Sequence, residues 1–469
     1  MKRHWRGCWT PKPCRESSWL QIDVSPRVFV QVWILELAIV LAFIWIGARL
    51  GSIGIGFAGG AGVVVLTLGF GVQPGEIPID VILIIMSVIS AIAAMQIAGG
   101  LDYLVQLAER LLRRNPRQIT ILAPVVTYLM TLFAGTGHTA FSTLPVIAEV
   151  ARKGGVRPSR PLAIATVASQ VAITASPISA AVVFMASTLE AQGVSYLQLL
   201  LICIPTSFAA VMVGAVVTSF LGKELEDDPE YQKRVASGWQ AKGVSTLDRE
   251  LMPGAKRSVG IFCIAILAVV GYATAISPSI ELIASPVLPR NEAIIAFMLT
   301  AATAISLLCQ VDTTKVLNAS VFKSGMSACI CVLGVAWLGN TFVSAHLEEI
   351  RSLASGLLEA HPWLLAIVLF FASMLLYSQA ATTKTLMPVA FSMGVTPYAA
   401  IAAFPAVNAL FVLPTYPTLL AAVEFDETGT TRIGKLVFDH PFLIPGLVTI
   451  VAAVVFGFLV SPIVLQLAI

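Results

Sequence analysis

Ten apolar runs of membrane-spanning length restrict the fold of this chain more than any other feature. A helix that crosses a bilayer needs about 20 apolar residues to cover a hydrocarbon core of roughly 30 Å. Of the 469 residues, 57% are hydrophobic and 12% are charged, which is too much apolar surface for one soluble core. The sequence therefore predicts an all-α polytopic membrane protein with about ten transmembrane helices. The runs cover residues 31–47, 54–70, 81–98, 161–189, 197–221, 258–276, 291–309, 324–345, 397–424 and 441–468.

Two further apolar segments, 119–150 and 362–392, are long enough to enter the bilayer twice, but small polar residues interrupt each of them at its centre. Arginines such as Arg114 and Arg157 stand on both sides of the first segment. Short loops rich in Lys and Arg stay in the cytoplasm, so both of its ends lie on one side. Two short spans would satisfy this, and so would a re-entrant hairpin. The polar tip favours the hairpin.

The same charge rule places the basic loop 222–257 in the cytoplasm and makes the second hairpin enter from outside. The elements then follow one another in the same order, with opposite orientation, in two parts of the chain, which predicts an inverted repeat. The predicted domains are a basic extension at 1–30, a first transmembrane repeat at 31–221 with hairpin 119–150, a cytoplasmic loop at 222–257, and a second repeat at 258–469 with hairpin 362–392.

The N-terminal extension does not fit the charge count. It should lie outside, yet it is the most basic tail of the chain. A signal peptide is one explanation, but the following apolar run has span length and no convincing cleavage signal. We favour a start of translation near Val30 or Val32, and mass spectrometry of the mature N-terminus would test this.

Polar residues interrupt the apolar runs at four places, two in each half of the chain. Unpaired backbone groups are tolerated at membrane depth only where they line a cavity or are buried in protein, and matched breaks in two halves indicate a transporter's substrate site. Gly, Pro, Ser and Thr also serve close helix packing, so a single such residue is weak evidence. The candidate substrate-binding residues are Gly135, Thr136, Gly137, His138, Thr139, Thr174, Ser176, Pro177, Ser179, Ser378, Gln379, Thr382, Pro414, Thr415 and Thr418.

The chemistry of these breaks suits an anion. Helix N-termini carry a partial positive charge, and small residues let anionic oxygens approach the backbone. Two facing clusters could each hold one carboxylate of a short dicarboxylate. Two readings stay open for His138, which either titrates with transport or caps the hairpin tip, and for Lys384, which either neutralises substrate or extends to the surface.

Other function classes have little support in this sequence. It has no HExxH, Walker or GxSxG pattern with partners, so we expect neither an enzyme nor a metal or cofactor site. The net charge of +3 is small and the basic residues lie in separate loops, so nucleic acid is not an expected partner. Membrane lipid is the expected surroundings of the chain.

Several short motifs follow one another from about Glu36 to the C-terminus. They include Ala98-Gly99-Gly100-Leu101-Asp102-Tyr103, Gly135-Thr136-Gly137-His138, Ile173-Thr174-Ala175-Ser176-Pro177, Ser378-Gln379-Ala380-Ala381, Leu413-Pro414-Thr415-Tyr416-Pro417 and Thr428-Gly429-Thr430-Thr431-Arg432-Ile433-Gly434. In this order they resemble the anaerobic C4-dicarboxylate transporter family, Dcu, in its DcuA/DcuB branch.

The resemblance implies a carrier in the bacterial inner membrane that exchanges fumarate, malate or aspartate for succinate during anaerobic respiration. It also implies a homodimer, because the family is similar to the wider ion transporter superfamily. His138 is more like the DcuB type, whereas Lys384 leans toward DcuA, so partnership with a sensor kinase and a preference for aspartate stay open. The alternatives are a cation-coupled symporter of organic anions and a transporter-like dicarboxylate sensor.

Overall fold

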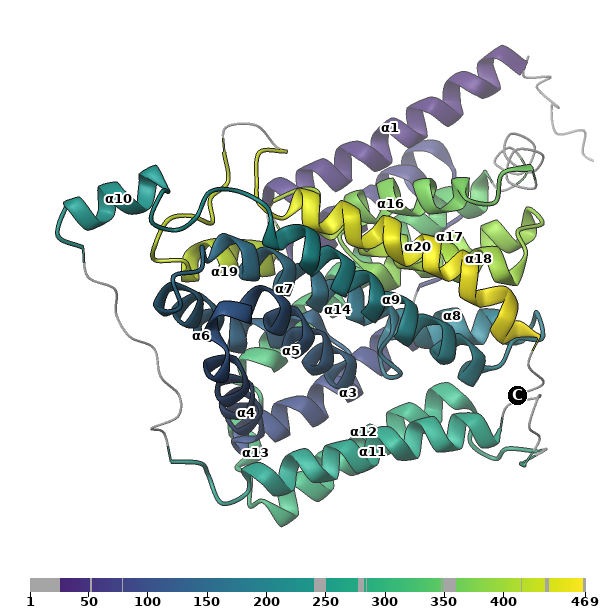
Figure 1. The fold of residues 1–469 in the computed structure, drawn as a ribbon. Helices are drawn as coiled ribbons and strands as arrows, with labels where there is room; N and C mark the ends of the chain where they lie inside the picture. The colour runs from purple at the N-terminus through teal and green to yellow at the C-terminus, as the bar shows by residue number, and fades with distance from the viewer. Residues whose placement is uncertain are drawn as a thin grey trace, which may run out of the picture.

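The computed structural model is built from helices, and all regular elements in its described residues are helical (Figure 1). The predicted N-terminal extension lies outside the described residues as far as residue 25. The described residues are 26–50, 53–77, 79–239, 250–276, 282–283, 285–346, 348, 360–414, 416–434 and 438–466.

Most of the apolar core lies in one bundle that combines elements from both halves of the chain. In the first half these are α4 (Gly100–Arg114), η2 (Pro116–Gln118), α5 (Ile119–Ala134), η3 (Gly137–Thr139), α6 (Ala140–Lys153), α7 (Ser159–Val171), η4 (Ala172–Thr174), α8 (Ala180–Glu190) and α9 (Tyr196–Ser219). In the second half they are α16 (Leu364–Leu376), α17 (Gln379–Ser392), α18 (Pro397–Ala403), η5 (Phe404–Phe411), α19 (Pro417–Phe425) and α20 (Leu443–Leu465).

Four of these units recur below under fixed names. The first hairpin is α5, η3 and α6, and the second hairpin is α16 and α17. The first broken helix is α7, η4 and α8, and the second broken helix is α18, η5 and α19. The first broken helix is interrupted next to the predicted residues Thr174 to Ser179, whereas the irregular backbone of the second begins at Asn408, ahead of the predicted Pro414.

Helices from the two halves pack on one another in a reciprocal way. From the first broken helix, α8 lies against α17 of the second hairpin, and from the second broken helix, α19 lies against α6 of the first hairpin. The last helix of each half, α9 and α20, also pack together along their length near the centre of Figure 1. The four interrupted units are therefore held in one body.

Two smaller groups of helices flank this bundle and have apolar clusters of their own. One contains α3 (Ile79–Ile97), α11 (Ala255–Ala275) and α12 (Arg290–Leu308), and the last two run side by side along the lower edge of Figure 1. The other contains α1 (Pro26–Leu50), α2 (Gly54–Val64) with η1 (Val65–Gly69), and α14 (Ser320–Ala345). The short helices α10 (Pro229–Ala236) and α13 (Thr313–Val316) lie in loops.

Glycines determine how α2 meets α14. A Cβ added at Gly56 would lie 2.2 Å from the carbonyl oxygen of Ile330, and one added at Gly59 would lie 2.4 Å from the carbonyl carbon of Gly334. Backbones can approach this closely only without side chains, as is common between membrane helices. The Gly-rich run that begins at Gly54 therefore serves close helix packing.

The membrane character of the chain is confirmed, and the number of spans can be compared with the expected ten. Each of the ten expected ranges overlaps a helix or a broken helix. In the described residues, six helices are long and apolar enough to cross a membrane, or seven if α3 and α4, bent by 74°, form one span. One of the six, Pro116–Ala134, contains the first arm of the first hairpin, although the sequence predicts a re-entrant hairpin there.

Candidate functional site

The turn of the first hairpin is closed by glycine and hydroxyl groups. Gly135 ends α5 with φ +68°, and a Cβ there would lie 3.0 Å from Cγ1 of Ile178 in the first broken helix. Thr139 is buried, with its Oγ1 3.2 Å from Oγ1 of Thr131, and it donates to the carbonyl of Thr136, also at 3.2 Å. The tip is thus fixed against the break that follows it in the chain.

Gly137 shows how tightly this tip packs. A Cβ added there would lie 3.1 Å from the backbone oxygen of Ser169, near the end of α7. A side chain would therefore push the turn away from the broken helix. The side chain of His138 lies outside the described residues. Its titration during transport and its capping of the hairpin tip therefore both stay predictions.

The first broken helix satisfies its interrupted backbone with its own hydroxyls. The Thr174 hydroxyl donates to the carbonyl of Val171 at 2.8 Å, and that of Ser176 reaches the carbonyl of Leu132 in the first hairpin at 2.6 Å. Ser179 caps α8, where its oxygen accepts the amide of Val182 at 3.2 Å. These side chains are all buried.

Two further contacts complete this break. Ser179 also donates to the carbonyl of Ile173 at 2.6 Å, which spans the interruption. The carbonyl of Pro177 accepts a hydrogen bond from the hydroxyl of Tyr196 at the start of α9. The break is therefore a fixed, hydrogen-bonded structure.

The second hairpin turns at a non-glycine residue with positive φ. Tyr377 ends α16 with φ +52°, and its ring stacks on that of Tyr416 with centroids 6.3 Å apart. Ser378 then caps α17 by accepting the amide of Ala381 at 3.2 Å, and Thr382 donates back to the carbonyl of Ser378 at 2.8 Å. Gln379, in the first turn of α17, is buried.

The two broken helices meet through side-chain amides. Asn408 in η5 donates through Nδ2 to Oγ1 of Thr174 at 3.0 Å. Gln170 in α7 donates through Nε2 to Oγ1 of Thr418, in the first turn of α19, at 3.3 Å. These four side chains, each no more than 1% exposed, are called the crossing cluster below. Of the remaining predicted residues, Pro414 is buried and Thr415 lies outside the described residues.

Three amide groups in this region lack hydrogen-bond partners among the described residues. They are Oε1 of Gln170, Oδ1 of Asn408 and Nε2 of Gln379. An unpaired buried polar group costs about 1–3 kcal/mol, so such groups are expected where a polar ligand or water supplies the missing partner. The crossing cluster therefore has hydrogen-bonding capacity that the protein does not use itself.

Sequence reasoning missed Gln170 and Asn408. Both are amides inside apolar runs, one four residues before Thr174 and the other six residues before Pro414. Their polarity among apolar neighbours was a usable signal, because a buried amide in a membrane helix needs a partner. The predicted Thr174 and Thr418 are brought together with them.

Lys384 faces the first half of the chain from α17. Its ammonium group lies 5.9 Å from the centre of the Phe184 ring on α8. A cation over an aromatic face is stabilised by the ring quadrupole. The Lys384 side chain therefore lies at the contact between the two halves, and its role toward substrate stays a prediction.

His440, in the turn before α20, contacts the backbone that follows η5 in the second broken helix. Its Nε2 donates to the carbonyl of Val412 at 3.1 Å, and the side chain is buried. Burial lowers the pKa of His440 below its ordinary value, and this outweighs the opposing effects of the Val412 carbonyl and of Asp439. The neutral imidazole is thus the form that fits the fold.

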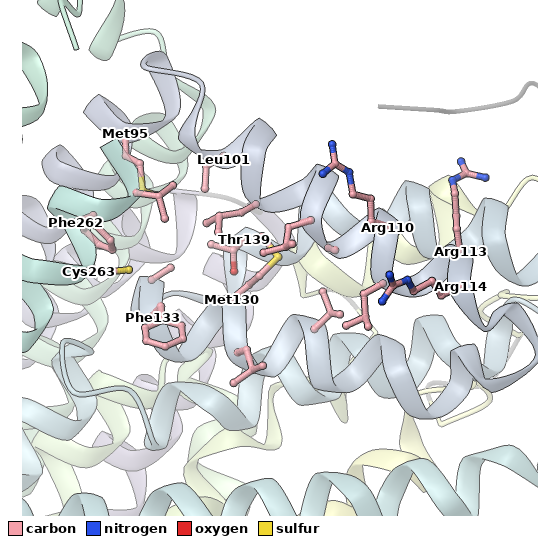
Figure 2. A pocket seen from close by; sticks show the side chains of 18 residues that line it. Met95, Leu101, Arg110, Arg113, Arg114, Met130, Phe133, Thr139, Phe262 and Cys263 are labelled. Atoms are coloured by element: carbon pink, nitrogen blue, oxygen red, sulfur yellow. The ribbon is translucent and has the colours of Figure 1, made fainter. Parts of the chain in front are cut away.

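A large cavity lies elsewhere in the described part of the chain and has a different chemistry. It has a volume of about 920 Å³ and lies between α4, α5 and α11 (Figure 2). Apart from three arginines and Thr139, its lining residues are apolar. Beyond the arginines at its end, a doubly charged small acid would lose its hydration in this cavity without gaining partners, so the apolar interior is not a suitable dicarboxylate site.

Broken membrane helices that meet at a buried polar cluster are characteristic of secondary transporters. The family model described as anaerobic C4-dicarboxylate membrane transporter matches residues 32–465. The chain therefore belongs to this family of transporters.

Known relatives agree with this assignment. The C4-dicarboxylate transporter DcuA of Wolinella succinogenes is 63% identical over 92% of this chain and 100% of its own length. DcuA of Escherichia coli K12 is 56% identical over 91% of this chain and 99% of its length. The anaerobic C4-dicarboxylate transporter DcuB of Escherichia coli O6:H1 is 37% identical over 91% of this chain and 97% of its length.

Proposed function

We propose that this protein is a secondary transporter that exchanges C4-dicarboxylates across the bacterial inner membrane, taking up fumarate, malate or aspartate and releasing succinate. The observation that carries the proposal is the crossing cluster, where Asn408 and Gln170 join the two interrupted helices and keep unpaired amide groups. Family membership and relatives named as C4-dicarboxylate transporters support the substrate class.

The proposed site surrounds this cluster. Its members are the predicted residues from Gly135 to Thr139, Thr174 to Ser179, Ser378 to Thr382 and Pro414 to Thr418, with Gln170 and Asn408 added. Helices α8 and α17 begin here with Ser179 and Ser378 as caps. The first turn of a helix attracts anions through its free amides and its dipole, so each carboxylate can replace water at such an end.

The proposed architecture is an inverted repeat of ten spans with two re-entrant hairpins. The reciprocal packing supports it, since α8 contacts α17 in the same way that α19 contacts α6. Matched left-handed turns support it further, because Gly135 and Tyr377 end the first arm of their hairpins in the same conformation. Two related halves would let the site open alternately to either side.

Exchange is tested with purified protein in vesicles. Vesicles loaded with succinate should take up labelled fumarate rapidly, whereas empty vesicles should take up little. Equal uptake into both would refute exchange, and dependence on a sodium or proton gradient would favour the cation-coupled symporter. Saturable binding without any uptake would favour the sensor.

Hydroxyl substitutions test the site itself. We expect Thr136→Ala, Ser176→Ala, Ser378→Ala and Thr415→Ala to slow exchange several-fold to a hundredfold at near-normal protein levels. An ordinary hydroxyl hydrogen bond contributes about 1 kcal/mol, and one to a charged group contributes up to about 3 kcal/mol. Thr206→Val is a matched control, because Thr206 is a buried hydroxyl on α9 that bonds to the carbonyl of Ile202 in its own helix. Control-like rates in all four variants would show that the breaks serve packing.

Two properties beyond the single chain complete the proposal. A homodimer is expected from the resemblance to the wider superfamily, and light scattering of the detergent-solubilised protein measures it. Partnership with a sensor kinase stays open, and co-purification from membranes at low detergent decides it: a kinase retained by the wild-type protein would favour the partnership, and its absence would speak against it.

A further inference from the structure

The bend between α3 and α4 creates a space that the protein does not fill. The two helices are bent by 74°, and Gly99 at the bend has φ +82°, a conformation that suits glycine. Beyond the bend, α4 packs on α6 and α11 instead of continuing along α3. The cavity of about 920 Å³ lies in the resulting wedge.

The walls of this cavity are those of a site for hydrocarbon. Leu107 and Leu111 from α4, Leu129 and Phe133 from α5, and Phe262 from α11 line it. The first four are also large apolar side chains that are more than 40% exposed, so the cavity is open along this side. In a membrane protein such an opening faces lipid, and acyl chains are the apolar material available there.

One end of the cavity carries positive charge. Arg110, Arg113 and Arg114 lie together at the end of α4, away from Met95 and Phe262 (Figure 2). Arg113 is engaged with Glu109 at 2.6 Å and with Glu149 at 2.9 Å. Arg110 and Arg114 are exposed and form no ion pair with any described residue. Two guanidinium groups therefore remain for an anion at the mouth.

The dimensions and the topology fit a single class of ligand. From Leu101 to Arg114, α4 rises roughly 20 Å, which exceeds the half-thickness of a hydrocarbon core of about 15 Å. The arginines belong to a loop region whose basic residues indicate the cytoplasmic side. Basic pockets between membrane helices on this side bind anionic headgroups.

We propose that this cavity is a binding site for an anionic glycerophospholipid of the cytoplasmic leaflet. Arg110 and Arg114 bind the phosphate, and an acyl chain lies along α4 between α5 and α11. The methyl end of the acyl chain then reaches Phe133 and Thr139 at the tip of the first hairpin. The site contains none of the four residues of the crossing cluster and shares only Thr139 with the proposed substrate site, and the proposal does not depend on which dicarboxylate the protein transports.

The headgroup is tested by native mass spectrometry of the full-length protein during titration with palmitoyl-oleoyl phosphatidylglycerol or phosphatidylcholine. A basic residue near an anionic headgroup contributes about fivefold in affinity, so the double variant Arg110→Gln/Arg114→Gln should bind phosphatidylglycerol roughly twentyfold more weakly. The double variant should then bind phosphatidylglycerol and phosphatidylcholine with equal affinity. The control is Arg117→Gln, which removes an exposed charge in the same region outside the cavity and should change binding less than about twofold.

The acyl chain is tested by filling the cavity. Leu107→Trp should weaken the binding of both lipids, whereas Leu267→Trp, an exposed position of α11 outside the cavity, should not. Val259→Phe fills the opposite wall and replaces Leu107→Trp if that variant does not fold. Inorganic phosphate at millimolar concentration should not displace bound phosphatidylglycerol.

Four results would overturn the proposal. They are equal affinity of the wild-type protein for both lipids, an equal loss in Arg117→Gln and in the double variant, unchanged binding in the folded cavity-filling variants, and displacement by inorganic phosphate. The last result would assign the arginines to a free anion.

Discussion

The two hairpin turns reach one backbone conformation with opposite side chains. Gly135 and Tyr377 both end the first arm of their hairpin with positive φ, and the amide of each donates to the carbonyl of a hydroxyl-bearing residue four positions earlier. The first turn leaves little room for a side chain, since a Cβ at Gly135 would lie 3.0 Å from Cγ1 of Ile178. In the second turn the side chain itself makes the contact by stacking on Tyr416.

In both halves the hairpin tip packs against the broken helix of the same half, but the kind of contact differs. Close backbone approach serves in the first half and an aromatic pair serves in the second. The two turns should therefore respond to substitution in opposite ways.

The largest effect is expected for Gly135→Ala. An added methyl group meets Ile178 and forces an L-residue into a left-handed conformation, which together cost about 2–4 kcal/mol of the free energy of unfolding. Gly155→Ala is the matched control, because Gly155 has φ +71° but nothing within 4 Å of its added Cβ. It should lose about 1 kcal/mol, from backbone strain alone. Unfolding in mixed micelles measures both, and equal losses would contradict the close approach at Ile178.

The second-largest effect is expected at the two serines that cap α8 and α17. Ser179→Ala removes a helix cap together with the hydrogen bond to Ile173, whereas Ser378→Ala removes a cap. We expect losses of about 2 and about 1 kcal/mol in the free energy of unfolding. Unfolding in the same micelles measures both variants. A larger loss for Ser378→Ala than for Ser179→Ala would contradict the stabilising role of the hydrogen bond from Ser179 to Ile173.

At Tyr377, unlike at Gly135, the stability of a variant should depend on whether the new side chain keeps the aromatic contact. Tyr377→Phe keeps the stacked ring and should unfold closest to the wild type of the three variants. Tyr377→Ala loses about 1 kcal/mol of aromatic contact and keeps the strain, whereas Tyr377→Gly loses the contact but relieves the strain. Thermal unfolding midpoints should thus rank Phe above Gly and Gly above Ala. The reverse order of Gly and Ala would show that the turn is not strained.

The smallest effect concerns pH, at His440 in the second half of the chain. Burial holds the pKa of His440 below its ordinary value of 6.5, so the unfolded chain binds this proton more readily than the folded one. The stabilisation is complete above pH 6.5 and is lost as the pH falls through the lower pKa of the folded state. Unfolding midpoints between pH 7.5 and 5 should decline less in His440→Gln than in the wild type. Parallel declines would exclude His440 as the cause.

Sequence alone predicted the helical class and the positions of the interruptions, because apolar length and polar breaks are local properties. Thr174, Ser179 and Ser378 were recognised in this way. The partners of these residues were not predictable, since Asn408 lies 234 residues from Thr174 and meets it only through tertiary packing. The positive φ at Tyr377 was also not predicted, because a tyrosine gives no signal for it.

The apolar cavity was beyond sequence reasoning for a similar reason. It arises from a bend at Gly99 that turns α4 away from α3, and the apolar residues around it read as ordinary membrane-facing positions. Pattern identifies a residue as apolar, but only the arrangement of three helices decides whether protein covers it.

The crossing cluster is the centre of this account, and succinate binding to Asn408→Leu is the measurement that tests it most directly. Titration calorimetry of the purified protein should give saturable binding for the wild type and at least a tenfold weaker affinity for Asn408→Leu, since a lost hydrogen bond to a charged ligand costs about 1.5–3 kcal/mol. Gln198→Leu removes a buried amide at the cap of α9 and should bind normally once folded. Unchanged affinity in Asn408→Leu would contradict a substrate site where the two broken helices meet.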